Sequence, residues 1–162
     1  MTALRVRPYA PVDRTACHGV FFRAVHEGAA AHYDAAQRAA WAPAPAPDPD
    51  KPDKLLSQWA WVAETAAKDI LGFISLRPDG YLDMAFVLPE ARGTDVAPAL
   101  LRALVAKARA EGLGRLTTHA SHLARRFFGK HGWQVDFAEA VPRNGQTLER
   151  FGMSITFPED GT

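Results

Sequence analysis

The chain has 162 residues, a length typical of one domain, so we expect residues 1–162 to form a single domain. Lys and Arg total 19 and Asp and Glu total 18, which gives a formal net charge of +1. Nucleic acids and anionic membranes select proteins with a strong basic surplus, so neither is expected as a partner. No apolar run approaches the roughly 18 residues of a membrane-spanning helix. The single cysteine, Cys17, excludes an internal disulfide and a cysteine-based metal site and predicts a cytoplasmic protein.

The N-terminal part of the chain predicts one strand and then two helices. Residues 4–7 alternate and end at Pro8, which is typical of a short strand. From Asp13, a favourable N-cap, apolar residues recur at helical spacing to about residue 28. A second helix is expected over residues 34–42.

Five of the twelve prolines fall within residues 43–52. Proline lacks the backbone N–H that helices and central strands need, so this segment is predicted to be an extended loop. The loop is either a plain linker or a mobile wall over a substrate cleft.

The rest of the chain predicts strands and helices in alternation. The expected strands span residues 59–65, 70–76, 81–88, 115–120, 133–141 and 147–157, and the expected helices span residues 96–111 and 122–131. The last two strands form a hairpin around Asn144-Gly145. The resulting order, βααβββαβαββ, indicates an α/β (α+β) fold, a mixed sheet with helices on both faces.

The segment from Phe86 to Leu101 links the strand at 81–88 to the helix at 96–111 through a short loop. Free backbone N–H groups and the positive end of the helix dipole meet at such a helix N-terminus, which favours a phosphate group. By itself this arrangement is a weak signal, because many α/β proteins have it without a ligand.

Three motifs sharpen the interpretation. They are Val-x-Pro-Glu-x-Arg-Gly at residues 87–93, Leu100-Leu101 in the following helix, and Ser121-x-x-Ala124-x-x-x-Phe128-x-x-x-Gly132-Trp133. Together with the order of elements, they resemble the GNAT superfamily of acyl-CoA N-acyltransferases. The resemblance implies a mostly antiparallel sheet of about seven strands with about four helices, and N-acetyltransferase activity with acetyl-CoA as co-substrate and no metal.

The resemblance also implies which residues hold coenzyme A. The expected cofactor-binding residues are Ala85, Phe86, Val87, Arg92, Gly93, Thr94, Asp95, Val96, Ala97, Ser121 and Phe128. The loop at 92–97 would hold the pyrophosphate, and the strand end at 85–87 would pair with the pantetheine amides. Four cations lie on the helix ends that would flank the cofactor: Arg92, Arg125, Arg126 and Lys130. The last three could instead simply face solvent on a short helix.

Three residues depart from the family pattern. Asp95 replaces a glycine of the loop, and as an N-cap it would compete with phosphate for the same N–H groups. Pro98 removes a donor from the first helical turn, and Phe128 stands where many relatives carry a tyrosine acid. We therefore expect acetyl-CoA to bind more weakly than in a relative with glycine in the loop. The alternative function is a catalytically impaired binding or regulatory module.

Asp83 and His119 are the candidates for the base that accepts the proton of the amine. Strand alternation places these side chains on one face: Tyr81, Asp83, Ala85 and Val87. Asp83 either faces a cleft or has a structural role, as a hydrogen-bonded buried acid or as the partner of an arginine. His119 either accepts a proton near neutral pH or is structural. A water chain could also carry the proton away without either residue.

The expected acceptor is a primary amine of a small molecule, ahead of a peptide. Four aromatic residues could either line a pocket for this acceptor or simply pack in the core: Tyr33, Trp41, Trp59 and Trp61. The spacing of His18, His26 and His32 does not fit a metal site. The edge of the C-terminal hairpin could pair with a second copy of the chain, so a homodimer is one possible oligomeric state.

Overall fold

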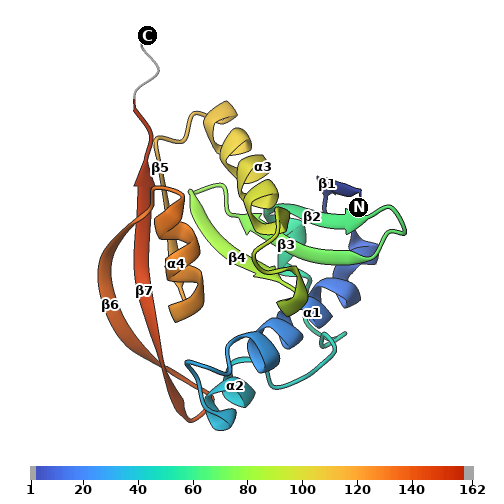
Figure 1. The fold of residues 1–162 in the computed structure, drawn as a ribbon, viewed down its shortest axis with the longest axis vertical. Coiled ribbons are helices and arrows are strands. Elements are labelled where there is room, and N and C mark those ends of the chain that lie inside the picture. The colour runs from blue at the N-terminus through green and yellow to red at the C-terminus, as the bar shows by residue number, and fades with distance from the viewer. Residues whose placement is uncertain (1–2, 159–162) are drawn as a thin grey trace.

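The computed structural model describes residues 3–158 (Figure 1). Its strands are β1 (Leu4–Pro8), β2 (Trp59–Thr65), β3 (Ile70–Leu76), β4 (Tyr81–Val87), β5 (Arg115–Ala120), β6 (Gln134–Arg143) and β7 (Gln146–Thr156). Its α-helices are α1 (Arg14–Arg23), α2 (Ala35–Trp41), α3 (Val96–Ala110) and α4 (His122–Lys130). The predicted order of strands and α-helices is confirmed. None of the helices within residues 3–158 is long and apolar enough to cross a bilayer.

The strands form one sheet of seven in the order β1-β2-β3-β4-β5-β7-β6. All neighbours are antiparallel except β4 and β5, which pair in parallel only at Tyr81–Thr117 and Leu82–Thr118. The Thr118 hydroxyl donates to the Leu82 carbonyl at 2.8 Å, and the two strands then diverge (Figure 1). The sheet is therefore split along its middle, next to the loop that leads into α3.

Helices cover both faces of the sheet, as predicted. The stripe of α3, with Leu100 and Leu104, packs in one core with Phe128 of α4. On the opposite face, Val20 of α1 packs with Phe73 of β3 in a second core. Burial of each such apolar side chain is worth about 1.5–3 kcal/mol, so both layers hold the split sheet in place.

The helix predicted from Asp13 to about residue 28 changes type within that range. The α-helix stops at Arg23, and a π-helical turn, Ala24–Gly28, continues the chain. Two arginines donate hydrogen bonds to backbone carbonyls of this turn. Arg38 donates to the His26 carbonyl at 2.5 Å, and Arg92 donates to the Gly28 carbonyl at 2.9 Å. Because both donors are remote in sequence, helical periodicity does not reveal the change.

The proline-rich segment is fastened to α1. Arg14 donates to the carbonyls of Asp48 at 3.2 Å and Lys51 at 2.8 Å, and the His18 ring bonds to the Ala44 carbonyl at 2.7 Å. No residue of 43–52 lines the two cavities described below. The contacts favour the linker interpretation over the mobile wall.

The C-terminal hairpin turns on two residues, Asn144 and Gly145, whose φ angles are +48° and +81°. Two consecutive positive φ angles match the twist of a tight hairpin, so the predicted turn is confirmed. Pairing continues up to the turn, from Gln134–Ser154 to Arg143–Gln146, and β6 forms an edge of the sheet.

Candidate active site

A cavity of about 530 Å³ lies where β4 separates from β5. Its walls come from the end of β4, the loop before α3, the start of α3, and α4. The expected cofactor-binding residues that line it are Ala85, Phe86, Val87, Arg92, Gly93, Thr94, Ala97, Ser121 and Phe128. Asp95 and Val96 do not line it: the Asp95 side chain lies on the surface and Val96 packs in the core.

A β-bulge sits on β4 at the mouth of the split. Ser75 pairs with Met84 and Leu76 with Leu82, so Asp83 is an extra residue without a partner on β3. Bulges bend a strand and re-aim its side chains. Beyond Leu82 no residue of β4 pairs with β5 within residues 3–158, so this edge of β4 faces the larger cavity.

The bulge also corrects the predicted face of β4. Leu82 lies in the same core as Ala85 and Val87, although strict alternation would place it opposite them. Tyr81 instead lines the second cavity with Met84 and Phe86, and Asp83, the extra residue, lines both cavities. The prediction that Tyr81, Asp83, Ala85 and Val87 share one face is therefore wrong, because the extra residue reverses the alternation.

The N-terminus of α3 keeps free backbone donors. The N–H groups of Gly93, Asp95 and Ala97 have no partner within the described part of the chain, and the Thr94 hydroxyl accepts weakly from Val96 at 3.4 Å. Asp95 occupies the N-cap position, but its side chain caps nothing. The expected competition between its carboxylate and phosphate for these N–H groups is absent from the structure.

The carboxylate of Asp95 points instead at Arg102, one oxygen lying 2.9 Å from the guanidinium, and both side chains are largely exposed. Such a surface pair is worth about 0–1 kcal/mol. It neutralises part of the negative charge beside the helix N-terminus, so Asp95 obstructs an anion less than the sequence suggested.

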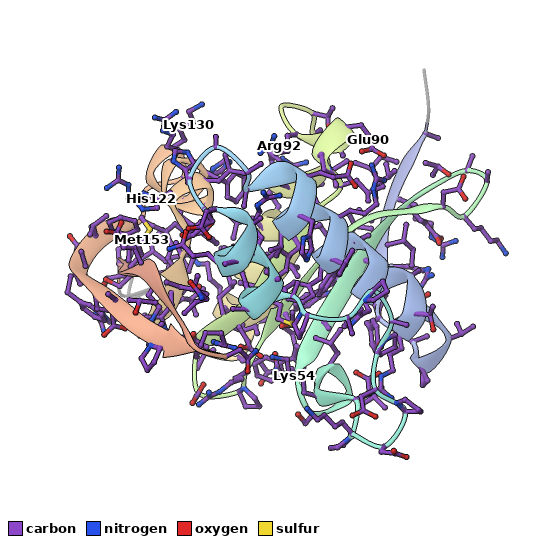
Figure 2. All side chains as sticks on the ribbon, turned by 90° about the horizontal axis from the view of Figure 1, so that it is seen from below. Lys54, Glu90, Arg92, His122, Lys130 and Met153 are labelled. Atoms are coloured by element: carbon purple, nitrogen blue, oxygen red, sulfur yellow. The ribbon has the colours of Figure 1, made fainter. Side chains whose placement is uncertain are left out.

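Three of the four expected cations line the larger cavity: Arg92, Arg126 and Lys130. Figure 2 shows Arg92 and Lys130 along the same side of the molecule. Arg125 does not join them, because its guanidinium lies 4.4 Å from the centre of the Phe151 ring. The cavity therefore combines basic side chains with the free N–H groups of α3, a combination suited to phosphate.

Ser121 and Phe128 hold α4 in place beside the cavity. The Ser121 hydroxyl caps the helix by accepting from the Ala124 N–H at 3.2 Å. Phe128 is buried, and its ring centre lies 4.9 Å from that of Trp133. Ser121 retains its own hydroxyl proton for a ligand, whereas Phe128 offers only an apolar surface.

A second cavity of about 220 Å³ lies on the α2 side of the sheet. Figure 2 shows Lys54, one of its lining residues, on the side of the molecule opposite Arg92. Of the four aromatic residues expected in an acceptor pocket, Tyr33 and Trp41 line this cavity. Trp59 and Trp61 instead pack against the core beneath α3, so core packing is their role.

The two cavities meet at a shared wall. The residues that line both are Trp41, Asp83, Phe86, His119 and Ser121. The two candidate bases, Asp83 and His119, both belong to this shared wall, where ligands of the two cavities could meet. We call this group the junction.

Asp83 is held by two neighbours. The Lys54 ammonium lies 3.3 Å from its carboxylate, and the Gln58 amide donates to the same oxygen at 2.8 Å. The side chain is partly exposed, so Asp83 is both accessible from the cavities and paired with a cation. The cleft-facing alternative fits the structure, and the ion pair that was also considered forms with a lysine instead of an arginine.

His119 lies in a chain of polar contacts. Its Nδ1 is 2.7 Å from the Tyr81 hydroxyl and its Nε2 is 3.7 Å from the Glu139 carboxylate, which in turn accepts from Arg150 at 2.6 Å. The carboxylate favours a proton on Nε2, so Tyr81 donates to Nδ1. Burial lowers the pKa of His119 below its usual 6.5, and the positive charge of Arg150 adds to this. The imidazole is therefore neutral at pH 7 and able to accept a proton.

Sequence reasoning missed the hairpin residues of the site. Arg143 and Arg150 of the β6–β7 hairpin line the second cavity, and Glu139 of β6 supports His119. The order of strands alone did not place this hairpin over α2. Within residues 3–158 no group of three His, Cys, Asp or Glu side chains is arranged to hold a metal ion.

Comparisons with known proteins agree on one family. The model of the acetyltransferase (GNAT) domain matches residues 50–156. The chain is 36% identical over 154 residues to the uncharacterized N-acetyltransferase YafP of Escherichia coli (strain K12), which spans 94% of this chain and 96% of that protein.

Solved structures show the same fold. A GCN5-related N-acetyltransferase from Rhodopseudomonas palustris, also described as an aminotransferase of class II, superposes with a TM-score of 0.87 at 31% identity, over 97% of this chain and 98% of that one. The PaiA N-acetyltransferase from Thermoplasma acidophilum, solved in complex with coenzyme A, superposes with a TM-score of 0.73 at 16% identity, over 96% and 99% of the two chains. The family match and the relative, which aligns over nearly the whole of both chains, together show that the chain belongs to the GNAT family of acetyl-CoA-dependent N-acetyltransferases.

Proposed function

We propose that the enzyme holds acetyl-CoA in the larger cavity and transfers the acetyl group to a primary amine of a small molecule in the smaller one. The observation that carries this proposal is the junction, where Asp83, His119 and Ser121 line both cavities. A donor and an acceptor that enter from the two sides would meet there.

The larger cavity suits coenzyme A chemically. The free N–H groups of Gly93, Asp95 and Ala97 would bind the diphosphate, with Arg92 and Lys130 balancing its charge. The unpaired edge of β4 beyond Asp83 offers backbone groups to the amides of the pantetheine arm. PaiA of Thermoplasma acidophilum, which shares the fold, was solved in complex with coenzyme A.

In the proposed reaction, bound acetyl-CoA supplies an activated acetyl group. The Tyr81 hydroxyl accepts the proton of the attacking amine and passes its own proton to Nδ1 of His119, to which it is hydrogen-bonded. Glu139 stabilises the imidazolium that results. Asp83 orients the amine, and backbone N–H groups of β4 polarise the thioester carbonyl.

Phe128 has no proton to give, so the sulfur would leave as thiolate without an acid at that position. This feature also favours the second candidate function, a GNAT domain that binds coenzyme A without catalysis. Release of coenzyme A as a thiolate at neutral pH keeps the first function chemically feasible.

The test is release of free thiol from acetyl-CoA in the presence of a panel of amines, beside thermal unfolding with coenzyme A. We expect a higher Tm with coenzyme A, amine-dependent thiol release, and a loss in kcat of about 10²–10⁴ in His119→Asn. Stabilisation without turnover on any amine would support the binding module instead. Failure of coenzyme A to raise the Tm would contradict both functions.

A further inference from the structure

We propose that the amine acceptor also carries a carboxylate, as an apolar amino acid does, and that Arg143 binds this carboxylate. The inference rests on the proposed function and names the substrate class of the same site. Three observations support the proposal: the position of Arg143, the charge balance of the smaller cavity, and the aromatic wall of that cavity.

Arg143 stands away from the junction. It is the last residue of β6, next to the Asn144-Gly145 turn, and it lines the smaller cavity but not the larger one. An amine placed beside Asp83 would thus have the rest of its molecule directed toward the hairpin. The tight turn and its pairing with Gln146 fix the backbone of Arg143.

The other charges of the smaller cavity are already paired. Lys54 bonds to Asp83 at 3.3 Å, Arg150 to Glu139 at 2.6 Å, and Glu149 to His122 at 2.7 Å. Of the charged residues that line this cavity, only Arg143 is outside these pairs within the described part of the chain.

Arg143 has no ion-pair partner among residues 3–158, so it is the one lining cation available to a ligand. A guanidinium presents a planar fork that binds a carboxylate through two hydrogen bonds. One unpaired positive charge matches one carboxylate, whereas a phosphate dianion would exceed it. The charge balance therefore favours an acceptor that carries a single negative charge at the hairpin.

The body of the acceptor would lie on an apolar wall. Trp41 packs at an angle against Phe21 and Phe86, with ring centres 6.5 Å and 6.1 Å apart, and all three line the smaller cavity. Leu148 and Val141 of the hairpin complete this wall. Apolar side chains fit here, while a second charge on the side chain would have no partner.

Binding to the complex with coenzyme A tests the inference without requiring turnover. The probes are L-phenylalanine, L-phenylalaninamide and phenethylamine, which share an amine and a ring and differ only in the carboxylate, followed by the same series built on leucine. Titration calorimetry should show the acid binding at least about 10-fold tighter than its amide or its amine, as expected for a charge-assisted pair.

The variant Arg143→Gln should abolish this preference, and Arg143→Lys should keep part of it. The matched control is Arg5→Gln, an exposed arginine on β1 at the far edge of the sheet, which should leave the preference unchanged. Coenzyme A affinity should be equal in all of these variants.

Two results would overturn the assignment of Arg143 while leaving the proposed function intact. One is coenzyme A binding together with equal affinity for acid, amide and amine, or with no binding of either series. The other is an acid preference that survives in Arg143→Gln. Failure of the wild-type protein to bind coenzyme A would instead contradict the proposed function itself.

Discussion

The exposed negative charge of Asp95 lies at the start of α3, and Arg102 partly offsets it. The position of Asp95 at the start of α3 was predictable from the sequence, because aspartate is a favourable N-cap before a helical pattern. The direction of its carboxylate was not predictable, because the carboxylate forms an ion pair with Arg102, seven residues further along the chain. Asp83 repeats the lesson, since alternation does not reveal that it is the extra residue of a bulge.

We predict that Asp95→Asn tightens coenzyme A binding by about two- to fivefold, because one exposed negative charge near the diphosphate is removed. Arg102→Gln should weaken it by a similar factor, because the charge of Asp95 is then no longer offset. Titration calorimetry at low and high salt measures both effects, which should fade at high salt. Unchanged or weaker binding in Asp95→Asn would contradict this account of the loop.

The pH profile of the enzyme should report on His119. Burial and Arg150 lower its pKa, so the acidic limb of kcat/KM should have its midpoint below 6.5. Arg150→Gln removes a positive charge and leaves Glu139 beside the imidazole, so the limb should move to higher pH. His119→Asn should eliminate the limb. A limb that stays in place in Arg150→Gln would show that another group titrates.

Among the secondary-structure elements, β4 has the largest part in shaping the site. Its short pairing with β5 opens the larger cavity, and its bulge brings Asp83 to the junction. The strand itself, the helix that follows and the hairpin turn were all predictable, because local periodicity and turn residues encode them. The π-turn at Ala24–Gly28 was not, because its carbonyls are bonded by distant arginines.

Gly72 of β3 should be necessary for the position of the β4 end. It pairs with Val87, and a Cβ added to it would lie 2.8 Å from the Val87 side chain and 3.0 Å from the Phe86 carbonyl oxygen. We predict that Gly72→Ala costs about 1–3 kcal/mol of stability through this overpacking. It should also weaken coenzyme A binding at least about 10-fold, because a displaced strand misplaces the pantetheine amides.

The matched control is Gly129→Ala on α4, where an added Cβ meets nothing within 4 Å. There the change should raise the free energy of unfolding by about 0.5–1 kcal/mol, because alanine favours the helix over glycine at an exposed position. It should not change the affinity for coenzyme A. Urea unfolding and calorimetry on both variants make the comparison. Equal coenzyme A affinity in Gly72→Ala and wild type would rule out a role for the β4 end.

For the whole molecule, the sequence predicted the order of elements and the two helical layers, because both follow from hydrophobic patterning. The smaller cavity was only partly predicted. Its walls come from α1, α2, β4 and the β6–β7 hairpin, and no local pattern says that the hairpin bends over α2. Contacts across the chain create this site, among them the Tyr33 hydroxyl bond to the Glu149 carbonyl at 2.9 Å.

Another long-range contact fixes the N-terminus to the sheet. Arg7 bonds to Asp13 at 2.8 Å and to Glu64 at 3.1 Å, and both carboxylates are about 95% buried. Arg7→Met would leave two buried charges unpaired, so it should cost about 3 kcal/mol at neutral pH. Arg5→Met, on the exposed side of the same strand, should change stability by less than about 0.5 kcal/mol.

The stabilising effect of Arg7 should depend on pH with a definite sign. Arg7 holds the pKa of Asp13 below its usual range in the folded state. Its contribution is therefore complete above the unfolded pKa of about 4 and is lost as the pH falls through the lower folded value. Urea unfolding at pH 7 and near pH 3 should show a smaller gap between wild type and Arg7→Met in acid. An equal gap at both pH values would contradict the assigned network.

We propose that acetyl-CoA binds in the split between β4 and β5, and a crystal structure with coenzyme A would locate the ligand. We expect the diphosphate within about 3 Å of the N–H groups at the start of α3, the pantetheine arm paired with β4 beyond Asp83, and the sulfur at the junction. A diphosphate bound elsewhere, or the Asp95 carboxylate turned into the N–H groups with coenzyme excluded at millimolar concentration, would contradict the account.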